Sequence, residues 1–456
     1  MSMEKKIIAK AFMEMAEGLE SGSFGVKPRI ALTGMGSEHG EENAMQAAVM
    51  AAARGVDVYY IGSLEHEGIT TIHVADDEEG HKMMEEMVEK GEVDGAVTMH
   101  FPFPIGVSTV GRVVTPAKGK EMFVANTTGT SSADRIEGMI KNAVYGIIAA
   151  KACGVKEPTL GILNVDGARQ TEMALKELQK NGYDFKFAES ARADGGAVMR
   201  GNDVLQGTPD VMVMDSLTGN VMVKMLSSFT TGGSFESTGY GYGPGIGRDY
   251  DKLVLIISRA SGAPLIANAL SFADELVRGG VQKIAKAEFA LADKAGLEEL
   301  FRRVRERIPG VVLRTSLITG LPGEGEAELE ELCVFLRETK IERAGVFPFS
   351  PEEGTRAARM DHVDMEEARR RAELVVDVQS DIIDAYNESV LGTEREVLCE
   401  GFDSAEGCYT GRTYADSPDI DGRVLFTAAG VIPAGTFVNV RITGMSDGDL
   451  TGEIEE

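Results

Sequence analysis

Between Arg29 and about Arg278 the sequence alternates between short apolar runs and amphipathic stretches with helical spacing. The run RIALTG precedes the helical stretch EENAMQAAVMAAARG; further β-rich runs are VDVYYIG, VDGAVTM, MFVAN, TLGILNV, DVMVMD and KLVLIIS. Strands that alternate with helices form a mostly parallel sheet with helices on both faces. Ligands of such α/β sheets bind at the carboxyl ends of the strands, so the residues just after each run are the candidates for a site.

The pattern changes twice after Arg278. A long charged helical stretch, VQKIAKAEFALADKAGLEELFRRVRERI, ends at Pro309-Gly310, which is a boundary signal. Two βα pairs follow, GVVLRTSLITG with EAELEELCVFLRET and RAGVFPFS with DMEEARRRAELVVDVQSDIIDAYNESV. From Gly392, short alternating strands with Gly and Asp turns predict a small all-β barrel in the oligonucleotide-binding style. We expect three domains, at residues 1–298, 299–391 and 392–456.

The composition narrows the class of protein. Of the 456 residues, 43% are hydrophobic and 26% are charged, as in soluble globular chains. No run approaches the roughly 20 apolar residues of a membrane span, and the N-terminal stretch MSMEKKIIAKAFMEMAEGLESG lacks the apolar core of an export signal. The formal net charge of −27, without a dense Lys/Arg run, argues against general nucleic-acid binding. We therefore expect a cytoplasmic protein with no membrane partner.

The four cysteines, Cys153, Cys333, Cys399 and Cys408, have no CxxC or CxxxCxxC spacing. Neither a zinc knuckle nor an iron–sulfur loop can be built from such local sequence, so no metal site is predicted. Cys153 is a candidate acyl-carrying nucleophile, but it falls in the last turn of an apolar helix, where the dipole disfavours a thiolate. Core packing is the interpretation that we favour for it.

Three clusters of small or polar residues follow strands in the first part of the chain. Gly36 and Ser37 precede a helix, where they form either an anion site or a tight βα turn. His100 at a strand end is either a catalytic acid or base or a structural histidine. Ser131 and Ser132 precede a helix, where their hydroxyls either cap it or bind an anion.

The segments LNVDGARQ and MDSLTGNVMVK are also polar strand ends that run into helices. The first contains Asn164, and the second contains Asp215, Thr218, Gly219 and Asn220. The second set has no evident role in a solvated loop, because an apolar helix follows at once. We interpret these residues as part of a ligand site.

Two further segments complete the candidate site. STGYGYGPGIGRDY is Gly-rich and contains Arg248, and such a segment is either a phosphate loop or a flexible lid. IISRASGAP contains Ser258, Arg259 and Ser261 at a strand end, and the guanidinium of Arg259 suits bidentate contact with phosphate.

Taken together, MGSEHGEENAMQAA, LGILNVDG, DVMVMDSLTGNVMVK and LVLIISRASGAPLIANAL resemble the acyl-phosphate-forming acyltransferases of phospholipid synthesis, the PlsX family. The stretch from His100 to Thr109, NTTGTSSADRIEGM and STGYGYGPGIGRDYDKLVLIISRASGAP more closely resemble the alpha subunit of component C of glycine/sarcosine/betaine reductase. The resemblance covers about Met1 to Leu297.

This resemblance implies transfer of an enzyme-bound acetyl group to inorganic phosphate, giving acetyl phosphate. It also implies two partners, a component C beta-type subunit and a selenoprotein acyl donor. The reaction needs an anion site and donors for an oxyanion. We assign catalysis to His100, Asn220 and Arg259, and substrate or phosphate binding to Gly36, Ser37, Ser131, Ser132, Asn164, Asp215, Thr218, Gly219, Arg248, Ser258 and Ser261. Ser258-Arg259-Ala260-Ser261 stands where the lipid enzymes have His-Gly-Ser-Ser, which suits a smaller acyl group.

IPGVVLRTSLITGLPGE, ERAGVFPFSPEEGTRAARM and GRTYADSPDIDGRVLF resemble the C-terminal part of the ribosomal-protein methylthiotransferases, the RimO family, over about Arg302 to Ile454. Those enzymes are radical S-adenosylmethionine proteins that end in a TRAM barrel. The resemblance therefore implies a partial βα-barrel fragment followed by a TRAM barrel. The CxxxCxxC loop and most of the barrel are absent, so the family's 4Fe–4S and S-adenosylmethionine sites are not expected here.

Three hypotheses follow from the two resemblances. In the first, the chain is an acetyl-phosphate-forming subunit with an inert or structural tail, and phosphate is a substrate and not a cofactor. In the second, it is a TRAM binding module for a ribosomal protein, with the first domain as a scaffold and no methylthiotransferase activity. In the third, two genes are joined in one sequence, and neither half reports on the other.

Overall fold

The computed structural model describes residues 27–193, 195–352, 355, 357–418, 420–446 and 448–454. The chain divides into two compact units, Met1–Leu297 and Glu298–Glu456. The amphipathic stretch that opens the sequence lies outside the described residues. The two units are described separately below.

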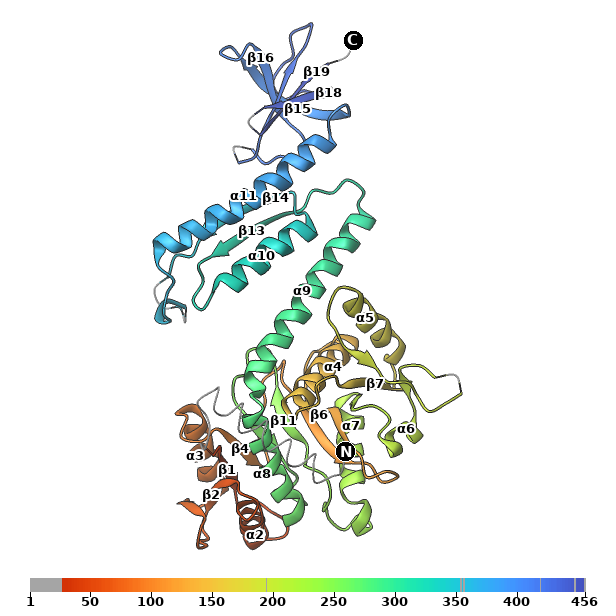
Figure 1. Cartoon of the computed structure of the whole chain (residues 1–456), viewed down its shortest axis with the longest axis vertical. Coiled ribbons are helices and arrows are strands. Elements are labelled where there is room, and N and C mark those ends of the chain that lie inside the picture. Colours follow the sequence, from red (N-terminus) through yellow and green to blue (C-terminus); the bar gives the residue numbers. More distant parts are fainter. Residues whose placement is uncertain are drawn as a thin grey trace, which may run out of the picture. The chain divides into compact units, whose positions relative to one another are not determined.

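Unit 1 is built on one large sheet (Figure 1). In the part of the chain that is described, its order is β3-β2-β1-β4-β12-β11-β5-β6-β10-β7-β8, with β9 paired to β7. The strands are β1 (Arg29–Thr33), β2 (Asp57–Gly62), β3 (Thr70–His73), β4 (Gly95–Thr98), β5 (Ser108–Val114), β6 (Glu121–Gly129), β7 (Thr159–Leu163), β8 (Lys186–Phe187), β9 (Val198–Met199), β10 (Val211–Val213), β11 (Gly243–Ile246) and β12 (Val254–Ile256).

Helices cover both faces of this sheet. They are α2 (Glu41–Ala52), α3 (Asp77–Glu89), α4 (Arg135–Ala152), α5 (Ala168–Lys180), α6 (Gly201–Gln206), α7 (Ser216–Ser227), the 3-10 turn η1 (Phe229–Thr231), α8 (Ala263–Arg278) and α9 (Val281–Arg307), which continues into unit 2. Alternate residues of β1 separate the two faces. Ile30 and Leu32 join the core that contains α2, α4 and α8, whereas Ala31 joins the core that contains α3. The predicted α/β class is confirmed.

The centre of the sheet is antiparallel, and this decides the role of the Gly-rich segment. β11 pairs antiparallel with both β12 and β5, and β5 pairs antiparallel with β6, while the remaining pairs are parallel. All four residues of β11 are buried. A Cβ on Gly243 would lie 1.7 Å from the carbonyl oxygen of Val110, so only glycine permits this approach. The interpretation of this segment as a lid or phosphate loop is wrong: its glycines serve close packing of a buried strand.

Unit 2 begins with a small βα layer (Figure 1). Its strands β13 (Arg314–Thr319) and β14 (Arg343–Pro348) pair in parallel, and α10 (Glu326–Thr339), the 3-10 turn η2 (Ala357–Arg359) and α11 (Met365–Ser389) complete it. Leu329, Leu336 and Val375 form the core between helices and strands. Ile318 and Phe347, a cross-strand pair, are 49% and 56% exposed, so one face of this two-stranded sheet carries apolar side chains in the open.

The rest of unit 2 is a closed barrel with the order β15-β16-β17-β19-β18. Its strands are β15 (Glu394–Asp403), β16 (Cys408–Arg412), β17 (Val424–Thr427), β18 (Phe437–Ser446) and β19 (Asp449–Glu453). Buried Val397, Val424, Phe426, Val440 and Ile442 fill it. Closure removes the free edges that short strands would otherwise expose, and the predicted small β-barrel is confirmed.

Candidate active site

A cavity of about 500 Å³ opens at the carboxyl ends of the central strands of unit 1. The chain returns to this point after β4, after β12 and along the first turns of α7. The lining residues are Met99, His100, Thr128, Asn220, Lys224, Tyr242, Ile256, Ile257, Ser258 and Arg259. The structure thus brings together His100, Asn220 and Arg259, the three side chains to which catalysis is assigned.

The start of α7 places Asn220 at the cavity. The Asp215 carboxylate caps the helix by accepting from the Thr218 amide (3.1 Å) and hydroxyl (2.7 Å), and it also pairs with Arg135 (3.1 Å). Burial by itself would raise the pKa of Asp215, but these hydrogen bonds and the Arg135 charge hold it below its ordinary value. The Asp215 and Thr218 side chains therefore act in the cap and do not line the cavity.

Gly219 sets how closely α7 approaches β6. A Cβ at this position would lie 1.7 Å from the carbonyl oxygen of Asn126, so any side chain would push the helix away from the strand. At this separation the Asn220 Nδ2 donates to the carbonyl oxygen of Thr127 at 3.1 Å. One of the two amide N–H groups of Asn220 is thus held by β6, and its fixed position aims the rest of the amide at the cavity.

The turn after β12 presents Ser258 and Arg259. Ser258 Oγ accepts from the Ala260 amide at 3.1 Å, and the Ser258 amide donates to Ser261 Oγ at 3.0 Å. Ser261 is buried, and its hydroxyl supports the turn by accepting this hydrogen bond. Arg259 is exposed, and within the described residues its guanidinium makes no hydrogen bond or ion pair. It is available for an anionic ligand.

The loop from Gly36 to Gly40, which follows β1, supports the turn after β12. The Glu38 amide donates to the carbonyl oxygen of Arg259 at 2.9 Å, and His39 Nε2 lies 3.2 Å from the carbonyl oxygen of Ala260. Ser37 Oγ accepts from the His39 amide at 3.1 Å within the loop. Gly36 and Ser37 thus belong to the tight turn that was one of the two interpretations, and the next two residues, Glu38 and His39, contact the backbone of the Arg259 turn.

His100 is exposed at the cavity wall, just after β4. Two side chains hold its backbone in place. The Thr98 hydroxyl donates to the His100 carbonyl oxygen at 3.3 Å, and His81 Nε2 lies 3.1 Å from the same oxygen. His81 Nδ1 in turn lies 3.4 Å from the Asp77 carboxylate. The loop is anchored while the His100 imidazole remains exposed.

Besides Gly36, Ser37, Asp215, Thr218, Gly219 and Ser261, four more residues of the predicted set lie outside the cavity lining. The Ser131 hydroxyl donates to the carbonyl oxygen of Gly138, and the Ser132 hydroxyl donates to the Glu137 carboxylate. The cap of α4 is Asp134, whose carboxylate accepts from the Glu137 amide at 2.8 Å, so neither serine caps the helix. Asn164 is exposed after β7. Arg248 forms an ion pair with Asp293 on α9, which directs its guanidinium to that helix.

Two charged residues, Lys224 in the cavity lining and Glu236 beside it, are not among the site residues predicted from the sequence. Lys224 lines the cavity one turn after Asn220, and its ammonium lies 3.5 Å from Glu236 Oε1. Glu236 is 1% exposed although it comes from a Gly/Ser-rich segment whose composition predicts a solvated loop. Helical spacing from Asn220 was a usable signal for Lys224, whereas nothing in the local sequence indicates that Glu236 is buried.

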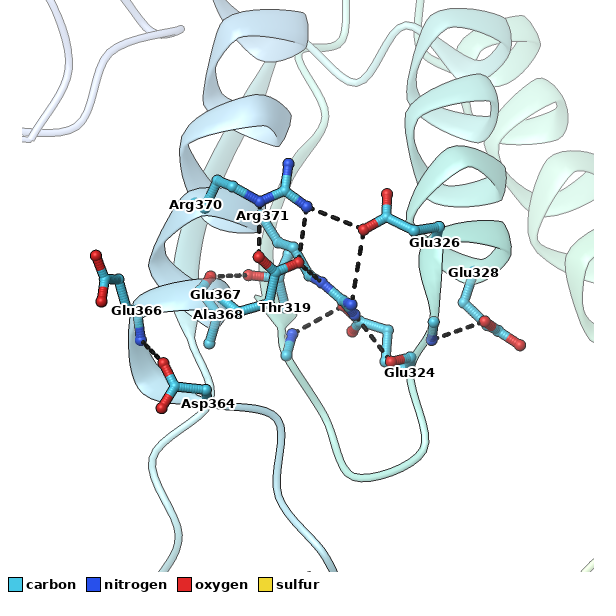
Figure 2. A network of polar contacts seen from close by, with 12 residues as sticks. Thr319, Glu324, Glu326, Glu328, Asp364, Glu366, Glu367, Ala368, Arg370 and Arg371 are labelled. Atoms are coloured by element: carbon cyan, nitrogen blue, oxygen red, sulfur yellow. Dashed lines mark hydrogen bonds and ion pairs between the residues drawn. The ribbon is translucent and has the colours of Figure 1, made fainter.

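Figure 2 shows the polar contacts around the turn of unit 2 that follows β13 and contains Glu324. The Glu324 carboxylate accepts from the amides of Gly320 (2.9 Å) and Leu321 (3.3 Å). Arg371 donates to Glu324 Oε1 at 3.2 Å, to its backbone carbonyl oxygen at 2.8 Å and to Glu367 at 2.8 Å. The amides of Gly320 and Leu321 thus already donate to the Glu324 carboxylate, and Arg371 holds that carboxylate in place.

The residues of unit 2 do not fit the 4Fe–4S cluster of the RimO family. Cys333 lies on α10, whereas Cys399 and Cys408 lie on neighbouring barrel strands. Burial raises the pKa of Cys333, and burial with nearby Glu406 and Asp403 raises the pKa of Cys408. Cluster ligands are thiolates from closely spaced cysteines. Cys333, Cys399 and Cys408 are not closely spaced in the sequence, and the raised pKa values of Cys333 and Cys408 disfavour their thiolates.

Comparisons with known proteins match the N-terminal and C-terminal parts of the chain to different families. The family described as "Fatty acid synthesis protein" matches residues 28–308, and that described as "TRAM domain" matches residues 391–454. The glycine/sarcosine/betaine reductase complex component C subunit alpha of Peptoclostridium acidaminophilum is 57% identical over 302 residues, covering 66% of this chain and 78% of the relative.

The C-terminal part matches ribosomal protein uS12 methylthiotransferases RimO. The protein of Desulforudis audaxviator is 45% identical over 159 residues, 35% of each chain, and that of Symbiobacterium thermophilum is 39% identical over 190 residues, 41% of this chain and 39% of the relative. This chain therefore spans less than half the length of these methylthiotransferases.

A branched-chain phosphotransacylase from Enterococcus faecalis V583 superimposes with a TM-score of 0.41 at 17% identity, covering 54% of this chain and 99% of the other. Both expected resemblances are confirmed by the sequence relatives. On the family match and the coverage of the alpha subunit, the chain belongs to the fatty acid synthesis protein family and to the family of component C alpha subunits of glycine/sarcosine/betaine reductase, with a TRAM domain at its C-terminal part.

Proposed function

We propose that this chain transfers an enzyme-bound acetyl group to inorganic phosphate and releases acetyl phosphate. The similarity to the component C alpha subunit supports an acyltransferase-type function. The observation that carries the finer assignment is the cavity that joins His100, Asn220 and Arg259 with Lys224. It offers two cations, an amide donor and an imidazole in one place, which is the set that this reaction needs.

Phosphate binds to the cationic side of the cavity. The Arg259 guanidinium makes a bidentate contact with two phosphate oxygens, since a planar fork matches that geometry. The Ser258 hydroxyl and the Lys224 ammonium are the neighbouring donors on the cavity wall. The apolar wall of Met99, Ile256 and Ile257 receives the methyl group of the acetyl substrate.

In the transfer step a phosphate oxygen attacks the acetyl carbonyl carbon, and the bond from that carbon to the carrier atom then breaks. The Asn220 amide donates to the carbonyl oxygen as it becomes an oxyanion, and removal of such a donor costs about 100- to 1,000-fold in rate. His100 accepts the proton that hydrogen phosphate loses and returns it to the departing carrier.

The partners follow from the same assignment. The name of the Peptoclostridium relative places that protein in a reductase complex. We propose a component C beta-type subunit and a selenoprotein acyl donor as partners of this chain, and the cytoplasm as their shared location. None of the helices in the described part of the chain combines the length and apolar composition that a bilayer crossing requires.

The test is exchange of radiolabelled phosphate into acetyl phosphate by the purified full chain, with and without a component C beta-type partner. We expect exchange with the wild type and its loss in Asn220→Ala and Arg259→Ala. Arg248→Ala is the matched control, because Arg248 pairs with Asp293 away from the cavity lining. Exchange that is equal in all four proteins, or that no wild-type preparation shows, would refute the assignment.

We propose for unit 2 a binding role without methylthiotransferase activity. The closed barrel and the TRAM match support binding, and the spacing of the four cysteines supports the absence of radical chemistry. The partner that the relatives' names suggest is ribosomal protein uS12. Calorimetric titration of uS12 into the full chain tests this, and the absence of heat at concentrations of about 100 µM would contradict it.

A further inference from the structure

We propose that Glu236 is a positioning residue of the active site: its buried carboxylate holds Lys224, Tyr242 and Ser261 in register around the cavity. The proposal rests on the function proposed above and extends it to a residue that does not line the cavity. Glu236 precedes the Gly-rich strand β11, in a segment that carries no recognisable motif.

The carboxylate is bound from three directions. Its Oε1 accepts from the Tyr242 hydroxyl at 3.0 Å and lies 3.5 Å from the Lys224 ammonium, while its Oε2 accepts from the Ser261 hydroxyl at 3.3 Å. Its backbone is fixed as well, since the Glu236 amide donates to the carbonyl oxygen of Ala260 at 3.1 Å. The three partners belong to α7, to the segment leading into β11 and to the turn after β12.

These three elements are separate walls of the cavity. Tyr242 and Lys224 line it directly, and Ser261 accepts from the Ser258 amide, which fixes the turn that carries Arg259. A carboxylate with 1% exposure cannot satisfy its oxygens with bulk water, so it holds its donors in place. Glu236 thereby fixes the spacing between the Lys224 ammonium and the Arg259 turn.

The same contacts give the two cations, Lys224 and Arg259, different roles. The charge of Lys224 is balanced by Glu236, whereas the Arg259 guanidinium has no partner among the described residues. Arg259 is then the principal phosphate ligand, and the Lys224 ammonium is held at one point of the wall. Removing the negative charge of Glu236 should leave phosphate binding intact or tighter while the placement of Lys224 is lost.

Unit 1 offers a matched control. Glu288 is 5% exposed, and its carboxylate accepts from the Tyr183 hydroxyl at 2.9 Å and pairs with the Lys151 ammonium at 2.5 Å. It reproduces the Glu–Tyr–Lys arrangement between α4 and α9, outside the cavity lining. Glu288→Gln therefore removes the same kind of buried charge without touching the site.

The experiment compares wild type, Glu236→Gln and Glu288→Gln as full chains. Three quantities are measured: the maximal rate of phosphate exchange, the phosphate concentration at half-maximal rate, and the Kd of inorganic phosphate by calorimetry. For Glu236→Gln we expect a maximal rate lower by about 10- to 100-fold, as for misplacement of a catalytic group by about 1 Å, with a phosphate Kd that is unchanged or several-fold lower. For Glu288→Gln we expect wild-type values of all three.

A double-mutant cycle with Lys224→Met shows through which side chain Glu236 acts. If it acts through Lys224, adding Glu236→Gln to Lys224→Met should slow exchange by less than about twofold. A Glu236→Gln protein that matches Glu288→Gln in exchange rate and phosphate Kd would overturn the proposal and leave the proposed function standing. If the wild type shows no exchange, the proposed function fails, and the phosphate Kd decides the positioning role: a higher Kd in Glu236→Gln refutes it.

Discussion

Replacing Gly219 by alanine should separate α7 from β6 and disable the active site. The reasoning starts from one distance: a Cβ on Gly219 would lie 1.7 Å from the carbonyl oxygen of Asn126. The Asn126 oxygen belongs to the backbone of a central strand, so it cannot yield as the end of a flexible side chain would. The helix must therefore move.

The size of the effect follows from that distance. Carbon and oxygen atoms that are not bonded to each other need about 3.0 Å or more, so the start of α7 must shift by roughly 1.3 Å. Forced overpacking of this kind costs about 1–3 kcal/mol of unfolding free energy. The shift also lengthens the hydrogen bond of 3.1 Å from Asn220 to Thr127, and a misplacement of about 1 Å costs about 100-fold in rate.

The assay is urea unfolding of the full chain together with phosphate exchange. Gly296→Ala is the matched control, because Gly296 is an exposed glycine within α9. Apart from the backbone of its own helix, none of the described residues has a heavy atom within 4 Å of the point where its Cβ would stand. This control should raise stability by about 0.5–1 kcal/mol and leave exchange unchanged. A Gly219→Ala protein with wild-type stability and wild-type exchange would show that the α7–β6 approach does not set the site.

Three further outcomes are expected. Arg371→Ala should lower the stability of unit 2 by about 1–3 kcal/mol, because it leaves the Glu324 carboxylate without its buried partner, while phosphate exchange persists; equal unfolding midpoints would contradict this. Asp215→Ala should destabilise unit 1 by about 0.5–2 kcal/mol. Because the pKa of Asp215 is lowered on folding, this difference should be full above the ordinary pKa of 3.8 and shrink as pH falls through the folded value, as pH-dependent urea unfolding would show. Cys333, whose pKa is raised by burial, should alkylate more slowly than a free cysteine at pH 7, and an equal rate by mass spectrometry would refute this.

Much of the candidate site was predictable from the sequence because parallel strands deliver their carboxyl ends to one edge. Asn220 and Arg259 follow two such strands, and His100 follows a third, so the expectation that they meet needs only the βα pattern. The cap by Asp215 is likewise local, since its partner Thr218 is three residues away. The two resemblances rested on contiguous motifs, and the relatives confirm both.

Some expectations differ from the structure where long-range packing decides the outcome. The Gly-rich segment is polar and flexible in composition, yet β11 pairs between β12 and β5 and is buried there. Arg248 has the residue type of a phosphate ligand, but its guanidinium forms an ion pair with Asp293, 45 positions later in the sequence. Neither neighbour can be identified from the local pattern.

The type and order of the elements were readable along the chain, because the periods of 2 and 3.6 residues are local properties. The same holds for the short motifs that start helices and for the strand ends that carry polar groups. Which polar groups lose water, and which partners they then acquire, depends on how distant segments pack. Glu236 is the clearest case. It is buried because α7, β11 and β12, which are distant in the sequence, pack around it. Because its carboxylate has lost water, it needs the contacts with Lys224, Tyr242 and Ser261.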